Sequence, residues 1–138
     1  MGKYADRQWY MERLSYYTAQ YGAVPPPWVY ADNSHPHSIR WRMGSGETMM
    51  MVFDEWWGQQ NWSEPERVDY FRKWPPPPRW IPWMSVRIWN LHPWDCDGQF
   101  DYAPWYKRIA KLGFAGVDDV ERDLDDPKWL ELESAPSD

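Results

Sequence analysis

The sequence predicts a mainly α-helical fold, with about six short helices around a tryptophan-rich core. Three observations carry this prediction. Apolar residues recur at three- and four-residue spacing through most of the chain, as they do on one face of a helix. Proline and glycine interrupt these runs at intervals typical of short helices. The 138 residues include 13 Trp and 9 Tyr, whose large rings can fill a core with few side chains.

The composition is compatible with a folded chain in spite of a mean hydropathy of −0.88. Hydropathy scales of this kind score Trp, Tyr and Pro as mildly polar, and these residues are abundant here. A chain of this length buries roughly 70% of its unfolded surface in one domain. We therefore predict a single globular domain over residues 1–132 and a frayed tail over residues 133–138.

Two helices are predicted in the first half of the chain, over residues 4–20 and 47–58. Gly22 follows the first helix and Gly58 ends the second, as glycine often does at a helix C-terminus. Each carries an apolar stripe at helical spacing. The stripes consist of Tyr10, Leu14 and Tyr17 in the first helix, and of Met49, Val52, Phe53 and Trp56 in the second.

A third helix is predicted over residues 64–74, because Ser63 and Glu66 form a capping-box sequence with Pro65 in the first turn. The four prolines at 75–78 cannot continue it. Their rigid extended geometry predicts a stiff joint between this helix and the next. The alternative is that the tryptophans beside them form a groove that binds a ligand.

Three further helices follow the joint. Residues 80–91 place Trp80, Met84, Ile88 and Leu91 on one face, and residues 103–112 align Trp105, Ile109 and Leu112. A short acidic helix is indicated by the spacing of Val117, Val120 and Leu124, and Pro127 ends it.

The arm over residues 23–43 is expected to be extended. Pro25–Pro27 favour polyproline geometry, and Pro36 disfavours a helix through His35. Residues 38–43 alternate polar and apolar side chains, as a short strand does. Two alternatives stay open: a small β-ribbon with residues 28–30, or an irregular arm packed on helices.

The acidic residues are concentrated at one end of the chain. Residues 117–138 hold nine acidic and two basic residues, a net charge of −7, whereas residues 1–116 hold 12 acidic and 13 basic residues. Most charge runs are solvated faces, but such a surface also speeds association with a partner of opposite charge. We predict a protein partner with a basic surface. The candidate contact residues are Asp118, Asp119, Glu121, Asp123, Asp125, Asp126 and Trp129.

Other partners are disfavoured by the sequence. The body lacks a basic run, so direct nucleic-acid binding is not expected. No apolar run is long enough to span a membrane, and no signal peptide is visible. Cys96 is the single cysteine, so an internal disulfide is impossible. These features predict a cytoplasmic protein-binding module, similar in type to small inhibitors, immunity proteins or antitoxins.

The alternative is a small-molecule or anion-binding site in the polar region between residues 35 and 55. A glycine-flanked serine at a helix start can offer backbone N–H groups to an anion, and two arginines precede it. An enzyme is the third possibility, with a histidine base and a glutamate acid. The candidate residues are His35, His37, Arg40, Arg42, Ser45, Gly46, Glu47 and Glu55.

No cofactor or metal is predicted. Zinc sites usually contain tighter ligand pairs than the His-x-His of residues 35–37. The acidic residues beside Cys96 disfavour its thiolate, which argues against a catalytic cysteine. No phosphate-binding loop or nucleophile motif is present in the sequence.

Overall fold

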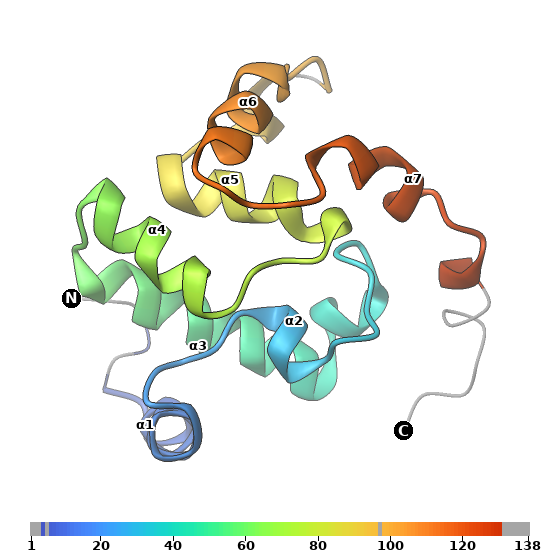
Figure 1. Cartoon of the computed structure of the whole chain (residues 1–138). Coiled ribbons are helices and arrows are strands. Elements are labelled where there is room, and N and C mark those ends of the chain that lie inside the picture. The colour runs from blue at the N-terminus through green and yellow to red at the C-terminus, as the bar shows by residue number, and fades with distance from the viewer. Residues whose placement is uncertain (1–3, 5, 97, 131–138) are drawn as a thin grey trace. The chain divides into compact units, whose positions relative to one another are not determined.

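The computed structural model describes residues 4, 6–96 and 98–130, and it is mainly helical (Figure 1). Helices α1–α7 and four short 3-10 helices, η1–η4, lie within these residues, residues 128–130 are helical as well, and no strand lies among them. The prediction of a mainly α-helical fold with a tryptophan-rich core is confirmed. The chain divides into two compact units, Met1–Trp62 and Ser63–Asp138. The single domain over residues 1–132 stays a prediction, and the tail at 133–138 lies outside the described residues.

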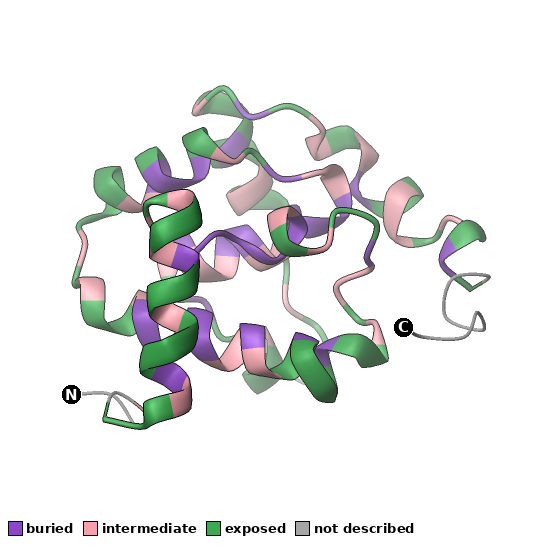
Figure 2. Ribbon diagram, turned by 90° about the horizontal axis from the view of Figure 1, so that it is seen from below, coloured by how far each residue is buried: buried purple, intermediate pink, exposed green. Residues whose placement is uncertain are grey.

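In the unit Met1–Trp62, α3 (Gly44–Gln60) is the central element. Both α1 (Gln8–Tyr21) and η1 (Ile39–Arg42) pack against it. The apolar stripe that the sequence predicted on α3 is buried, and Figure 2 shows buried and exposed residues alternating along the helices. Burial of one stripe per helix stabilises each α-helix against the core. The buried core residues of this unit are Tyr10, Tyr17, Val24, Trp28, Trp41, Met49, Val52, Phe53 and Trp56.

The expectation of a small β-ribbon in the arm is wrong for the residues that the structure describes. Residues Pro27–Tyr30 form α2, and residues Ile39–Arg42 form η1. Local hydrogen bonds explain the difference: Ser38 Oγ accepts from the Arg40 backbone N–H at 3.2 Å, and the Trp41 indole N–H donates to the His35 carbonyl at 3.0 Å. A serine cap of this kind favours a helical turn over a strand. The residues that alternate between polar and apolar therefore form a 3-10 turn and not a strand.

In the unit Ser63–Asp138, α5 (Ile81–Trp89) is the central element. Both α4 (Glu64–Lys73) and α6 (Ala103–Lys111) pack against it. The remaining elements are η2 (Pro78–Trp80), η3 (Pro93–Cys96), η4 (Val117–Asp119) and α7 (Val120–Leu124). The buried hydrophobic residues of this unit are Val68, Tyr70, Phe71, Trp80, Ile81, Met84, Ile88, Leu91, Ile109, Phe114, Val120 and Trp129.

The proline run connects α4 to η2 and α5. Pro77 has φ −65° and ψ 159°, which is polyproline geometry, and η2 begins at Pro78. Arg79 and Trp80, directly after the run, are both buried. The prolines thus place two buried side chains at the start of α5.

Within the described residues, none of the helices combines the length and apolar character that crossing a membrane requires.

Candidate partner-binding surface

The acidic segment, defined here as residues 117–126, is built from η4 and α7. Gly116 precedes it with φ 98°, a conformation that glycine adopts readily. A Cβ at that position would lie 3.0 Å from Pro78 Cγ, so the chain passes close to the proline run there. Val120 is buried at 1% exposure and is the apolar anchor of α7. The segment is therefore packed onto its own unit.

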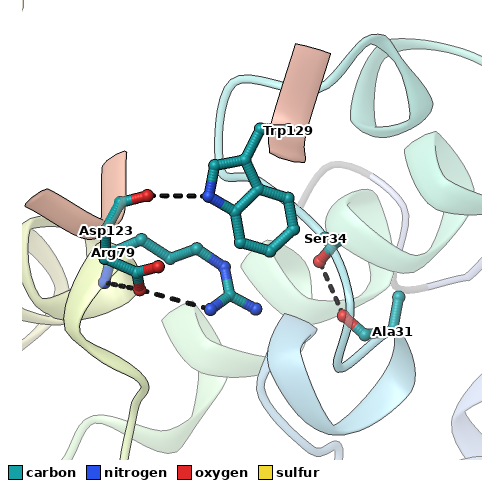
Figure 3. A network of polar contacts seen from close by, with 5 residues as sticks. All are labelled: Ala31, Ser34, Arg79, Asp123 and Trp129. Atoms are coloured by element: carbon teal, nitrogen blue, oxygen red, sulfur yellow. Dashed lines mark hydrogen bonds and ion pairs between the residues drawn. The ribbon is translucent and has the colours of Figure 1, made fainter. Parts of the chain in front are cut away.

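A buried polar network holds the C-terminal side of this segment (Figure 3). Asp123 Oδ2 accepts the Arg79 backbone N–H at 2.9 Å and the Arg79 guanidinium at 3.3 Å. The Trp129 indole N–H donates to the Asp123 carbonyl at 2.7 Å, and the guanidinium lies 4.3 Å from the centroid of the Trp129 ring. The side chains of Arg79 and Asp123 are 8% and 15% exposed. Charge, hydrogen bonding and stacking thus all act on one arginine.

The network separates the predicted contact residues into two groups. Asp123 forms an ion pair with Arg79, and the Trp129 ring stacks on the Arg79 guanidinium. Asp119 forms an ion pair with Arg122, and Asp126 Oδ1 accepts the backbone N–H of Lys128 at 3.0 Å. The Asp119–Arg122 pair lies on the surface, with side chains 46% and 78% exposed, so the contacts to Arg79 are the ones that hold the segment on its unit.

The second group faces solvent. Asp118, Glu121 and Asp125 are exposed, and their carboxylates make no hydrogen bond or ion pair with another described residue. Three exposed negative charges on a packed backbone form a surface that a basic protein can approach without first ordering it. These three side chains are the candidate contact residues that the structure leaves accessible.

A basic face that the sequence reading missed lies on α6. Lys107, Arg108 and Lys111 are all exposed, and this helix contains no acidic residue. The Arg108 guanidinium carbon lies 5.0 Å from the Trp105 ring centroid and 5.9 Å from that of Trp89. The signal was present in the sequence, because i, i+1 and i+4 positions share one side of a helix.

The basic face and the acidic segment belong to neighbouring elements. Helix α6 packs on η4, which leads directly into α7. Burial raises the pKa of the Tyr106 hydroxyl on α6, with further contributions from Tyr102 and then from the Glu121 carboxylate. An electrostatic effect of Glu121 on Tyr106 requires that the two lie close together.

The alternative site is only partly assembled by the fold. The His35 and His37 rings lie 5.3 Å apart, and the His37 backbone N–H donates to His35 Nδ1 at 3.0 Å. Burial, His35 and Arg42 lower the pKa of His37. The region thus brings His35, His37 and Arg42 together, while Arg40 is exposed on η1.

In the predicted anion-binding turn, Gly46 is buried against the chain. Gly46 packs against the Arg40 carbonyl so closely that an added Cβ would lie 2.8 Å from the carbonyl carbon. A carbonyl oxygen at this place disfavours an anion, because both are negative. Ser45 and Glu47 are exposed beside it, with Glu47 in the first turn of α3. The small-molecule site stays a prediction without added support from this geometry.

Glu55 does not join that region. Nine residues separate it from Gly46 along α3, which corresponds to about 13 Å of helix. Its carboxylate accepts the Tyr4 backbone N–H. Burial, with a smaller effect of Glu55, raises the pKa of Tyr10, whose hydroxyl is buried without a hydrogen-bond partner among the described residues. Glu55 is therefore placed to hold the chain before α1.

In the part of the chain that the structure describes, no three His, Cys, Asp or Glu side chains are grouped so that they could hold a metal ion. The expectation of no metal and no cofactor stays a prediction.

No family model matches the chain, and no curated protein or solved structure matches it. The case for a function therefore depends on the chain's own residues.

Proposed function

We propose that this chain is a small protein-binding module whose acidic segment binds a partner with a basic surface. The observation that carries the proposal is the packed acidic segment, on which Asp118, Glu121 and Asp125 are exposed and form no ion pair with another described residue. Charges of one sign on an ordered surface select and steer a partner of the opposite sign. An inhibitor, an immunity protein or an antitoxin would use a surface of this kind.

Anchoring matters for this function, because ordering a loop on binding costs about 0.5–1.5 kcal/mol per side chain. The Arg79–Asp123–Trp129 network and the burial of Val120 have already ordered this backbone. The attraction between the exposed carboxylates and a basic partner is then not reduced by the cost of ordering this backbone.

The test has two steps. The tagged chain is first purified from its own cells at low salt, and native mass spectrometry identifies a stoichiometric protein partner. The association rate constant of that purified partner is then measured for the wild type and for Asp118→Asn/Glu121→Gln/Asp125→Asn. We expect the variant to associate about tenfold more slowly at low salt, and the difference to vanish near 1 M salt.

The matched control is Asp6→Asn/Glu47→Gln/Asp95→Asn, which removes three exposed carboxylates from other elements. It changes the net charge by the same amount, so it separates a local surface from the charge of the whole chain. Equal association rates for the wild type and the segment variant, or an equal loss in both variants, would contradict the proposal.

A further inference from the structure

We propose that the basic surface bound by the acidic segment is the basic face of α6 on a second copy of this chain. The two copies would pair reciprocally, so that the Lys107, Arg108 and Lys111 side of each faces the Asp118, Glu121 and Asp125 side of the other. This inference rests on the proposed function, because it uses the same segment.

Neither charged set is neutralised by an ion pair with another described residue. The ammonium groups of Lys107 and Lys111 form no ion pair or hydrogen bond with any described residue. Arg108 contacts rings and no carboxylate. The same holds for the three exposed carboxylates of the segment. Three bases and three acids thus stay available on one unit.

The two charged sets lie on elements that pack together. Helix α6 packs on η4, which carries Asp118 and leads into α7, so the helices that carry the two sets are neighbours within one unit. A two-fold axis between adjoining patches of opposite sign brings each patch onto its complement in the other copy. Such an interface is self-complementary and closes at two chains.

Aromatic side chains lie beside the bases on α6. Trp105 and Tyr106 are half-buried on α6, and Tyr102 stacks on Tyr106 at 5.5 Å with an interplanar angle of 12°. The Trp89 and Trp105 rings, 5.2 Å apart, hold the guanidinium of Arg108 in a fixed place. Tyr, Trp and Arg are the residues that contribute most at protein interfaces.

Two chains of net charge −6 repel each other. Salt screens this long-range repulsion more strongly than it weakens the attraction between charges in contact. At about 0.1 M salt the Debye length is about 10 Å, so charges in contact still attract while more distant charges are screened. At about 1 M it is about 3 Å, and the contact pairs weaken too. Self-association should therefore be present near 0.1 M and lost near 1 M.

The test is sedimentation of the full chain over a wide concentration range. The wild type is expected to approach the mass of two chains near 0.1 M salt. Lys107→Glu/Lys111→Glu and Asp118→Lys/Asp125→Lys should each stay monomeric, because each opposes like charges. Arg108 and Glu121 are left unchanged, and keeping Arg108 preserves its contacts with the Trp89 and Trp105 rings. An equimolar mixture of the two variants restores both attractive contacts and should form a dimer again.

Arg7→Glu/Arg13→Glu is the control, since it reverses two exposed bases of α1 and its N-cap. Monomeric wild type, an equal effect of this control, or a mixture that stays monomeric would each overturn the dimer. If the wild type is monomeric while Asp118→Asn/Glu121→Gln/Asp125→Asn still slows a basic partner, only the dimer fails. If neither the dimer nor that slowing is seen, the proposed function fails with it.

Discussion

At the scale of single residues, Arg79 illustrates why a buried charge can be specific. Its guanidinium bonds to one carboxylate while its flat face stacks on an indole. A lysine could supply the charge but neither the planar stack nor the forked donors. Removing a partner from such a pair costs more than the pair contributes, because the remaining charge stays buried.

Asp123→Ala should therefore lower the free energy of unfolding by about 3 kcal/mol, measured by denaturant titration. Asp125→Ala is the matched control two residues away. Its carboxylate is exposed, so a change within about 0.5 kcal/mol is expected. Similar losses in the two variants would show that the Arg79 pair has no special role.

Two glycines of α3 make a second comparison. Gly46→Ala places a methyl group against the Arg40 carbonyl, whereas Gly58 has no atom within 4 Å of an added Cβ. Overpacking costs about 1–3 kcal/mol, and alanine in an open helix position gains about 0.5–1 kcal/mol over glycine. Thermal unfolding should thus shift down for Gly46→Ala and up for Gly58→Ala. Stabilisation by both would contradict the close packing of η1 on α3.

At the scale of elements, the capping box of α4 is the clearest local signal for a helix start in the sequence. The Ser63 backbone N–H and Oγ both donate to Glu66 Oε1, at 3.1 and 2.9 Å. These two hydrogen bonds lower the pKa of Glu66 in the folded state. A lowered pKa means that this stabilisation is complete above the unfolded value of 4.5 and is lost as the pH falls through the folded value.

Ser63→Ala should accordingly destabilise the protein by about 1 kcal/mol at neutral pH. The difference from wild type should shrink as the pH falls below 4.5, because protonated Glu66 no longer accepts both bonds. Unfolding titrations at several pH values measure this. Ser15→Ala, on the exposed side of α1, is the control and should show no such pH dependence. A constant difference for Ser63→Ala would rule out the carboxylate as the acceptor that matters.

Helices could be predicted where the apolar periodicity and the capping residues indicated the same bounds. The predicted helix at 64–74 is α4 over Glu64–Lys73, and the one at 103–112 is α6 over Ala103–Lys111. The β-ribbon prediction for the arm was wrong because six residues of alternating polarity, 38–43, fit a strand and a 3-10 turn equally well. Local hydrogen bonds to Ser38 Oγ and to the His35 carbonyl favour the 3-10 turn over the strand. The periodicity of apolar residues does not indicate such hydrogen bonds.

At the scale of the whole molecule, charge asymmetry could be read from the sequence but its use could not. Counting residues locates the acidic excess, yet it gives Asp118 and Asp123 equal weight. The fold exposes Asp118 and pairs Asp123 with Arg79, which is 44 residues away in the chain. Such long-range pairing has no local signature, so the accessible part of a charged surface emerges only from the folded arrangement.

That separation of 44 residues has a consequence for synthesis on the ribosome. Arg79 is made 44 residues before Asp123, so its guanidinium cannot pair with that carboxylate until the later part of the described chain has been made and released. The second unit can then mature only late, whereas residues 1–62 can begin to fold as they appear. A chain that stops before residue 123 lacks the carboxylate with which Arg79 pairs in the folded unit.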